Sequence, residues 1–264
     1  MYDYHTHTLF SADSNASFKT MLDAAVNIGI IELAITDHYD PEYANADLPF
    51  DLDFKAYQDS LNQYAELYKH KIKLIKGIEI GIQKKVLNKC RIAANSYAYD
   101  FILGSFHCAR NKELYGGDFF KDKAPAFAYY DFYTYVYECL TNYDEYSVIG
   151  HFNIIDRYAS VIPDFKGYSD VVEAIMKYII SKGKGLEINT SSYRYGMGEN
   201  RTPSDEILKL YKSLGGEILT IGSDAHFPED LACEFPRTIE YLNSFGFKYI
   251  TTFEKLKSKQ IKLI

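Results

Sequence analysis

Short apolar runs alternate along the chain with longer stretches in which apolar residues recur every three or four positions. The short runs predict β-strands and the longer stretches predict amphipathic helices. The expected strands are Tyr2–His5, Glu32–Thr36, Lys73–Ile80, Phe101–Ser105, Ser147–His151, Gly185–Ile188 and Ile218–Gly222. The expected helices are Phe18–Ile28, Phe54–His70, Lys84–Ala98, Phe127–Asn142, Ser169–Lys182, Pro203–Leu214 and Phe235–Ser244. This alternation indicates an α/β fold, and seven strands with intervening helices favour a barrel over an open sheet.

Residues at the predicted helix ends agree with these boundaries. Ser17 precedes the first helix and Thr202-Pro203 begins the sixth, while Gly29, Gly183 and Gly215 follow helices. The 264 residues fit one barrel domain, so we expect a single domain over residues 1–264. The loop from Asp40 to Asp53 is long, acidic and contains proline, which makes it a candidate lid over the active site.

Composition narrows the class of protein. Hydrophobic residues make up 47% and charged residues 25%, as in globular proteins, and no run approaches the roughly 18 apolar residues of a membrane span. The first residues lack the basic start and apolar run of a signal peptide, so the expected location is the cytoplasm. A net charge of −7 gives no bulk attraction to nucleic acid or to an anionic membrane. The sequence does not indicate an oligomeric state. Four widely spaced cysteines are expected to be reduced thiols: Cys90, Cys108, Cys139 and Cys233.

Two further stretches have an unusual composition. Tyrosines gather between Ala128 and Tyr146, and the pattern favours a helix packed by aromatic residues over a stacking platform for bases. The Lys-rich tail from Lys255 to Lys262 is interpreted as the solvated face of a helix or strand.

The histidines carry most of the chemical information. Six of the seven lie at or just after the end of a predicted strand: His5, His7, His38, His107, His151 and His226. In a parallel barrel all of these ends face one opening, where such folds keep their active sites. Histidine is a common ligand for zinc and similar metals, and the pairs His5-x-His7 and Asp224-x-His226 each follow a strand. The sequence therefore predicts a metal centre at this opening.

Two carboxylates extend the candidate ligand set. Glu79 interrupts the apolar run from Ile78 to Ile82, and burying an unpaired carboxylate is unfavourable, so a metal or another cation must compensate its charge. An ordinary ion pair is the alternative for Glu79. Asp13 lies six residues after His7, where it could equally be a turn residue.

The ordered motifs resemble the polymerase and histidinol phosphatase (PHP) superfamily, and the length of the chain resembles its histidinol-phosphate phosphatase branch. The motifs are His5-Thr6-His7-Thr8, Thr36-Asp37-His38, Gly77-Ile78-Glu79, Gly104-Ser105-Phe106-His107, Gly150-His151 and Gly222-Ser223-Asp224-Ala225-His226. Amidohydrolases also begin with H-x-H on a barrel strand, but they typically add a mid-barrel carboxylated lysine and end in a lone Asp.

The resemblance implies a distorted (β/α)7, TIM-like barrel of the PHP type that binds three divalent ions, with Zn, Mn and Fe as candidates. By the family pattern, His5, His7, Glu79 and Asp224 hold the first ion, and Glu79 bridges to a second ion that His107 and His151 also bind. Asp13, His38 and His226 hold the third. Some relatives have His at the position of Asp13, and Asp makes the third site richer in oxygen, which favours Mn or Fe over Zn.

Hydrolysis of a phosphate ester fits such a site. A water bridging two of the ions would become the nucleophile, while the ions neutralise charge on the phosphoryl oxygens. A water at the third site, Asp224 and His226 are the candidates for protonating the leaving oxygen, and Glu79 bridges the ions. Arginines suit the phosphate because their planar fork binds two oxygens, and the candidates near the strand ends are Arg157, Arg194 and Arg110.

The predicted activity is hydrolysis of L-histidinol phosphate to L-histidinol and phosphate, a step of histidine biosynthesis. The expected partner is therefore a small-molecule phosphate monoester, with no nucleic acid and no membrane. Two alternatives remain open: a PHP-type phosphodiesterase or small-nucleotide phosphatase, and a non-catalytic, regulatory metal-binding barrel.

Overall fold

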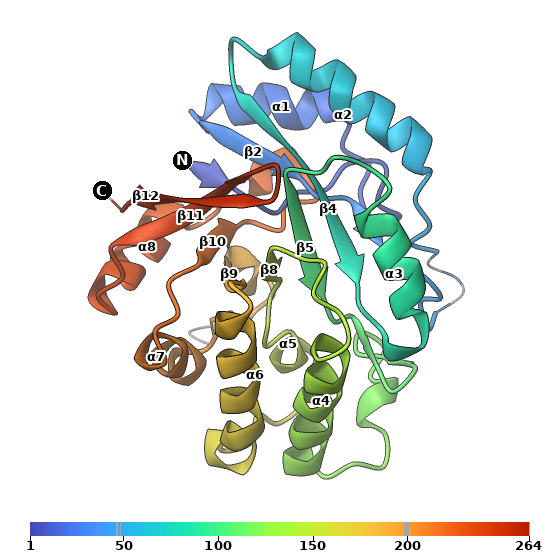
Figure 1. The fold of residues 1–264 in the computed structure, drawn as a ribbon, viewed down its shortest axis with the longest axis vertical. Helices are drawn as coiled ribbons and strands as arrows, with labels where there is room; N and C mark the ends of the chain where they lie inside the picture. The colour runs from blue at the N-terminus through green and yellow to red at the C-terminus, as the bar shows by residue number, and fades with distance from the viewer. Residues whose placement is uncertain (46, 48, 198–200, 264) are drawn as a thin grey trace.

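Seven parallel strands form the centre of the molecule in the computed structural model, which describes residues 1–45, 47, 49–197 and 201–263 (Figure 1). Their order follows the sequence: β1 (Tyr2–Asp3), β2 (Glu32–Ile35), β4 (Lys73–Gly81), β5 (Phe101–Ser105), β8 (Val148–Ile149), β9 (Gly185–Asn189) and β10 (Leu219–Gly222). The short β3 (His38–Tyr39) also pairs with β4. Backbone hydrogen bonds from Tyr4 N–H to Ile221 O (2.9 Å) and from Asp224 N–H to His5 O (2.8 Å) join the last strand to the first. The predicted barrel is confirmed.

Helices pack around these strands. They are α1 (Phe18–Asn27), α2 (Phe54–Tyr68), α3 (Leu87–Ala94), α4 (Pro125–Leu140), α5 (Ile155–Tyr158), α6 (Ser169–Ser181), α7 (Asp205–Ser213) and α8 (Phe235–Ser244). Short 3-10 helices lie between them: η1 (Lys84–Val86), η2 (Asp118–Phe120), η3 (Phe165–Gly167), η4 (Thr190–Tyr193) and η5 (Pro228–Asp230). The apolar faces of the helices bury a large core against the strands. No helix among the described residues is long and apolar enough to span a bilayer.

Local sequence signals explain most of the helix ends. Ser17 and Ser204 cap α1 and α7 by accepting hydrogen bonds from backbone N–H groups, as small polar residues do at these positions. Gly29, Gly183 and Gly215 follow helices with φ values of +77°, +65° and +86°, a conformation that glycine adopts without steric cost. These three stop signals are confirmed.

Several predicted boundaries were wrong. The sixth of the predicted helices, α7, begins at Asp205 after its cap Ser204 and not at Thr202-Pro203. The helix expected over Lys84–Ala98 ends at Ala94, because the side chains of Asn95 and Ser96 bond the carbonyls of Arg91 and Ala93 and so replace the next helical turn. The strand expected over Ser147–His151 is limited to Val148–Ile149.

The chain ends in a hairpin that was not predicted from the sequence pattern. It is formed by β11 (Tyr249–Glu254) and β12 (Lys257–Lys262). Phe253 of this hairpin packs in a buried cluster with Tyr4, Ala34, Ile75, Phe101, Leu103 and Val148. Ile75 and Glu79 are four residues apart in β4, so their side chains point to the same side of the sheet. The cluster therefore fills the barrel beneath the residues at its opening.

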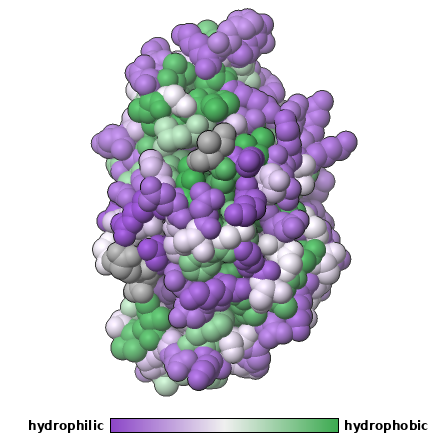
Figure 2. All heavy atoms as spheres, turned by 90° about the vertical axis from the view of Figure 1, so that its left-hand side faces the viewer, coloured by the Kyte–Doolittle hydropathy of each residue, from purple (hydrophilic) through white to green (hydrophobic). Residues whose placement is uncertain are grey.

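The outer strand of this hairpin carries the Lys-rich tail. Lys257, Lys259 and Lys262 are exposed, which confirms a solvated strand face and protects the free edge from pairing with another chain. Figure 2 shows this side of the molecule, where hydrophilic residues dominate and apolar areas lie between them. A second small hairpin joins β6 (Cys108–Ala109) to β7 (Lys112–Glu113).

Most of the tyrosine-rich segment forms α4, and many of its aromatic side chains are packing groups, although Tyr130 is exposed. Tyr129 and Tyr133 are fully buried, and the Tyr133 ring stacks on Tyr168 with centroids 5.2 Å apart. All four cysteines are unpaired thiols, as expected.

Candidate metal centre

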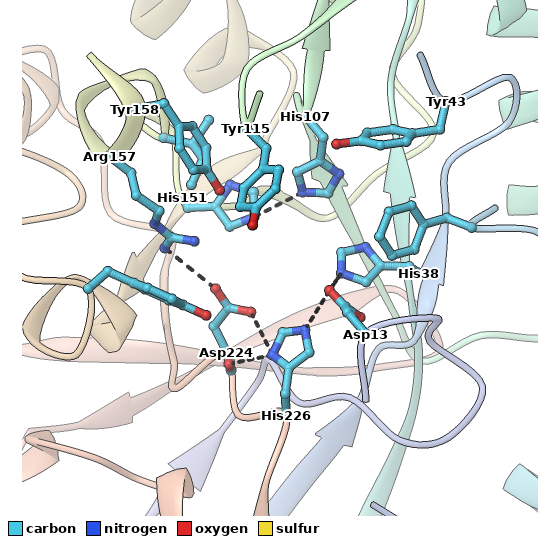
Figure 3. Close-up of a pocket in the computed structure, with 13 residues that line it drawn as sticks. Asp13, His38, Tyr43, His107, Tyr115, His151, Arg157, Tyr158, Asp224 and His226 are labelled. Carbon is cyan, nitrogen blue, oxygen red and sulfur yellow. Dashed lines mark hydrogen bonds and ion pairs between the residues drawn. The ribbon is translucent and has the colours of Figure 1, made fainter. Parts of the chain in front are cut away.

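All nine predicted ligands meet at the carboxyl ends of the strands. Six of them line a cavity of about 500 Å³, within the range of small-molecule sites: Asp13, His38, His107, His151, Asp224 and His226 (Figure 3). His5, His7 and Glu79 are fully buried beneath it. His70, the histidine outside the strand-end pattern, lies after α2.

The first cluster brings together residues that follow the first strand, β1, and the last strand of the barrel, β10. Nε2 of His5 lies 3.1 Å from Glu79 Oε2 and 3.5 Å from Asp224 Oδ1. Nε2 of His7 lies 3.5 Å and 3.4 Å from the same two oxygens. Asp224 reaches this position from a left-handed backbone conformation with φ +56°, which turns its side chain inward directly after β10. Four side chains from β4, the β1 end and the β10 end thus point at one centre.

The second cluster uses the other oxygen of Glu79. Oε1 lies 3.0 Å from His151 Nε2 and 3.3 Å from His107 Nε2, and the two imidazole nitrogens are 3.3 Å apart. Glu79 therefore faces the first cluster with Oε2 and the second with Oε1.

The third cluster lies on the outer side of His7. Asp13 Oδ2 is 3.2 Å from His226 Nε2 and 3.9 Å from His38 Nε2. The rings of His38 and His226 both lie against His7, with centroid distances of 4.3 Å and 4.2 Å, and their own centroids are 6.1 Å apart. The Asp13 carboxylate therefore faces two of the histidines, so Asp13 is not merely a turn residue.

These distances fit bound metal ions. Ligand atoms arranged tetrahedrally at zinc bond lengths lie roughly 3.4 Å from one another, close to the donor separations in the first two clusters. Nε2 of His7 is buried, and its nearest carboxylate oxygens lie 3.4 Å and 3.5 Å away, which leaves this nitrogen poorly satisfied unless another group binds it. Ion-binding groupings within the described residues include His5–His7–Glu79, which belongs to the first cluster. Another, His38–Glu79–His107, joins His38 of the third cluster to the second, since His38 Nδ1 also lies 3.1 Å from Glu79 Oε2.

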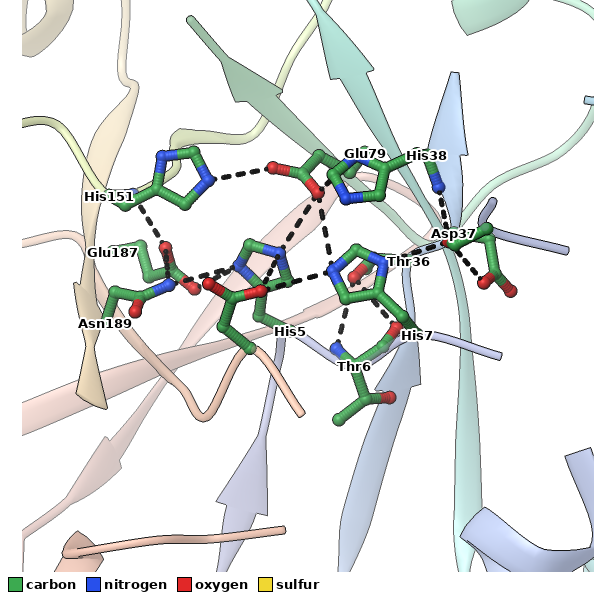
Figure 4. Close-up of polar contacts among 12 residues, drawn as sticks. His5, Thr6, His7, Thr36, Asp37, His38, Glu79, His151, Glu187 and Asn189 are labelled. Carbon is green, nitrogen blue, oxygen red and sulfur yellow. Dashed lines mark hydrogen bonds and ion pairs between the residues drawn. The ribbon is translucent and has the colours of Figure 1, made fainter. Parts of the chain in front are cut away.

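A second layer of hydrogen bonds orients the histidines (Figure 4). Nδ1 of His5 is 2.7 Å from Glu187 Oε1, and Nδ1 of His107 is 2.7 Å from Asp40 Oδ1. Such partners fix the proton on Nδ1 and leave Nε2 free to bind a metal. Neither carboxylate was predicted from the sequence in this role. Glu187 had the same signal as Glu79, an acidic residue inside an apolar strand.

At two of the fully buried ligands, Glu79 and His7, the electrostatics favour the forms that bind metals. Burial alone would raise the pKa of Glu79, but His38, His5 and His107 nearby hold that pKa well below its usual value. Burial, with His226 and His38 close by, lowers the pKa of His7 to about 3. Glu79 is therefore ionised and His7 neutral near neutral pH, as metal ligands must be.

The three candidate arginines have different environments. Arg157 lines the cavity, where its Nη2 donates to Ser191 Oγ (2.5 Å) and its guanidinium lies 4.2 Å from the centroid of the Tyr195 ring. Arg194 is next to the site, but its Nη2 donates to the carbonyls of Ser223 and Asp224, so it braces the backbone that carries Asp224.

The structure does not place Arg110 at the cavity, which corrects that prediction. Its guanidinium pairs with Asp131 (2.9 Å) and with Glu138 (3.0 Å), both on α4. The β6–β7 turn directs the side chain toward α4, where these carboxylates satisfy its charge.

The acidic loop after β3 contributes two aromatic side chains to the cavity, Tyr43 and Phe50. Tyr115 and Tyr195 line it from other loops and Tyr158 from the end of α5, and no sequence pattern had pointed to any of these five rings. Movement of the loop as a lid stays a prediction, and residues 46 and 48 of the loop lie outside the described residues.

Comparisons with known proteins agree with this geometry. The model of the PHP domain family matches residues 3–191. A probable histidinol-phosphatase of Clostridium acetobutylicum is 30% identical, with 97% of each chain covered, and a histidinol-phosphatase of Lactococcus lactis is 27% identical over 97% of this chain and 95% of that protein. The structure of histidinol phosphate phosphatase from Lactococcus lactis, complexed with Zn, L-histidinol and phosphate, superimposes with a TM-score of 0.88 at 27% identity and covers 98% of each chain.

Proposed function

The chain belongs to the PHP domain family, and we propose that it is a metal-dependent phosphoric monoester hydrolase that converts L-histidinol phosphate to L-histidinol and phosphate. The observation that carries the proposal is the convergence of nine metal-ligand side chains on one cavity that Arg157 also lines. Similarity to histidinol-phosphatases over nearly the whole chain supports this substrate and a place in histidine biosynthesis.

Three divalent ions would occupy the three clusters. His5, His7, Glu79 and Asp224 would hold the first, Glu79, His107 and His151 the second, and Asp13, His38 and His226 the third. When bound, such ions supply the nucleophile by lowering the pKa of water, and they neutralise charge on the phosphoryl oxygens. Zinc is bound by the similar Lactococcus lactis structure, while the carboxylate of Asp13 also suits Mn or Fe.

The side chains of the cavity would divide the remaining tasks. Arg157 would bind two phosphoryl oxygens through its planar fork. Asp224 directs Oδ1 toward His5 and His7, while its Oδ2 lies 3.7 Å from Arg157 Nη2. A water at the third site, His226 and this second oxygen of Asp224 stay the candidates for giving a proton to the leaving alcohol. Burial raises the pKa of Asp224, but His5, His7, His226 and Arg157 hold it well below its usual value.

The aromatic lining would select the rest of the substrate. Phe50, Tyr115 and Tyr158 offer ring faces and edges, which suit the flat imidazole of histidinol. A cavity of about 500 Å³ holds a substrate of this size and excludes most of the water around it.

The test is a phosphate-release assay on purified protein loaded separately with Zn, Mn and Fe. We expect kcat/KM for L-histidinol phosphate to exceed that for p-nitrophenyl phosphate and phosphoserine by about 10²-fold or more, because only the first fills the aromatic cavity. Equal rates on all monoesters would refute the substrate assignment. Faster hydrolysis of bis-p-nitrophenyl phosphate would favour a phosphodiesterase, and inactivity with every metal would favour a regulatory barrel.

A further inference from the structure

Strand β9 and the 3-10 helix η4 that follows it carry three buried polar side chains, Glu187, Asn189 and Ser191, that are not among the nine ligands. Their exposed fractions are 0%, 2% and 0%. Glu187 and Asn189 are two residues apart, so they share the inner face of β9, and Ser191 follows in η4. Buried polar groups are unfavourable unless they are paired, so the partners of this row indicate what it does.

Glu187 makes a hydrogen bond to one residue of each of the first two clusters. Its Oε1 accepts from Nδ1 of His5 (2.7 Å), and its Oε2 accepts from the backbone N–H of His151 (2.7 Å). His151 has a φ of +23°, an unfavourable conformation for this residue, and the bond to Glu187 helps to keep it. One carboxylate therefore sets the ring of one ligand and the backbone of another.

Asn189 links Glu187 to Ser191. Its Nδ2 donates to Glu187 Oε2 (3.1 Å), and its Oδ1 accepts from the backbone N–H of Ser191 (3.0 Å). The Ser191 hydroxyl lies 2.5 Å from the same Oδ1. These bonds hold the three side chains in one fixed arrangement along the strand.

The Ser191 hydroxyl stands between a cation and a carboxylate. Its Oγ accepts from Arg157 Nη2 (2.5 Å) and lies 3.1 Å from Asp224 Oδ2, while Arg157 Nη2 and Asp224 Oδ2 remain 3.7 Å apart. Without the hydroxyl, the guanidinium would close on the carboxylate, because charge-assisted bonds of this kind are strong and short. The hydroxyl thus keeps Arg157 turned toward the cavity.

We propose that Glu187, Asn189 and Ser191 are positioning residues that hold the first metal ligand, His5, and the phosphate-binding Arg157 in fixed register. The inference rests on the proposed function in one respect, namely that Arg157 binds phosphate. If so, β9 and the 3-10 helix η4 that follows it set the distance between the metal centre and Arg157.

The first experiment measures the binding of inorganic phosphate to zinc-loaded protein by calorimetry. Ser191→Ala is expected to weaken binding about tenfold, the effect of losing one hydrogen bond to a charged group. In an Arg157→Ala background the same change should have no further effect, because Ser191 acts through Arg157. Ser191→Thr keeps the hydroxyl and should bind within about threefold of wild type.

Three results would overturn this part of the proposal. They are unchanged phosphate affinity in Ser191→Ala, an equal loss with and without Arg157, and no phosphate binding by the zinc-loaded wild type. The assay contains no histidinol phosphate, so a failure of the proposed substrate would appear only in the turnover assay and would leave this result readable.

The second experiment measures zinc affinity by competition with a chromophoric chelator. Glu187→Gln keeps the shape of the side chain but replaces one accepting oxygen by an amide donor, so zinc binding should weaken by roughly 10- to 100-fold. Glu217→Gln is the matched control, because Glu217 is exposed before β10. Circular dichroism checks that each variant is folded, and a folded Glu187→Gln protein with wild-type zinc affinity would contradict the proposal.

Discussion

Glu79 is the residue on which both inner clusters depend, since Oε2 faces His5 and Oε1 faces His151. Glu79→Gln removes the negative charge between the two proposed ions. We expect kcat to fall by about 10²-fold or more and the bound-zinc stoichiometry to drop, because the electrostatic contribution of such a group is large in a buried site. Elemental analysis and phosphate release measure the two effects. A variant with full zinc content and activity would show that Glu79 is an ordinary buried acid.

Arg157 and Arg110 allow a matched comparison of two arginines. Lysine lacks the planar fork, so Arg157→Lys should lower kcat/KM about tenfold or more, mainly through a higher KM. Arg110→Lys should leave both constants within about twofold of wild type, because Arg110 pairs with Asp131 and Glu138 away from the cavity. Steady-state kinetics on the same substrate test the pair, and a larger loss in Arg110→Lys would reverse the assignment.

Asp156 gives a stability effect that depends on pH. Burial raises its pKa to about 6, although Asn153 and Tyr129 donate hydrogen bonds to it. Because the folded state holds this proton more tightly than the unfolded state, the contribution of Asp156 to stability is full below pH 4 and is lost as the pH rises to about 6.

Asp156→Asn removes this titration. The free energy of unfolding of wild type minus that of the variant should therefore fall by up to about 3 kcal/mol between pH 4 and pH 7. Urea unfolding at several pH values measures this difference in unfolding free energy. The contributions of the other titrating groups largely cancel, because they are the same in both proteins. A difference that stays constant across this range would contradict the raised pKa.

At the scale of elements, the β11–β12 hairpin closes the end of the barrel opposite the metal centre. The Phe253 ring lies 5.2 Å from Phe101 and 6.4 Å from Tyr4, and the Tyr4 hydroxyl accepts from the Phe253 backbone N–H (2.9 Å). The hairpin therefore completes the interior of the barrel, although it is not part of the parallel sheet.

Phe253→Ala should destabilise the protein by about 3–5 kcal/mol, because it leaves a cavity in a closed cluster. Zinc stoichiometry should not change, since the metal centre lies at the other end of the strands. Phe127→Ala, at an exposed position of α4, is the control and should change stability by less than about 0.5 kcal/mol. Urea-unfolding midpoints of the two variants measure their stabilities. Equal losses in both would mean that Phe253 does not complete the packing of the barrel interior.

At the scale of the whole molecule, the metal centre ties the first strand to the last. The clusters combine residues from positions 5 to 226, so ions bound there should stabilise the closed barrel. Zinc at 100 times its dissociation constant adds about 2.7 kcal/mol per site, which raises the melting temperature by roughly 5 °C or more.

Treatment with EDTA should therefore lower the melting temperature and abolish activity, and added zinc should restore both. The stabilisation should weaken as the pH falls below 6, because protons compete with metal for imidazole nitrogens. Calorimetric scans with and without zinc at pH 5 and pH 8 measure the melting temperature and its dependence on zinc and pH. Identical scans would show that the clusters do not bind zinc in solution.

The sequence by itself determined the barrel and most of the nine-residue cluster, whereas Asp13 entered the cluster only through the resemblance to the PHP superfamily. Strand alternation and helix-stop signals are local properties, and in a parallel barrel every strand end faces the same opening, so position along the chain was enough to bring His5, Glu79 and His226 together. The strand of Glu187 was predicted in the same way, and its acidic residue could have been recognised by the argument applied to Glu79.

Only the tertiary structure decided which polar groups remain available at the opening. Arg110 and Arg157 both follow strand ends, but α4 supplies carboxylates to the first, whereas Ser191 holds the second at the cavity. The same holds for Phe253, whose place in the barrel depends on a hairpin more than 240 residues after Tyr4. Such pairings are long-range, because they arise from how elements pack, and no local pattern in the sequence encodes them.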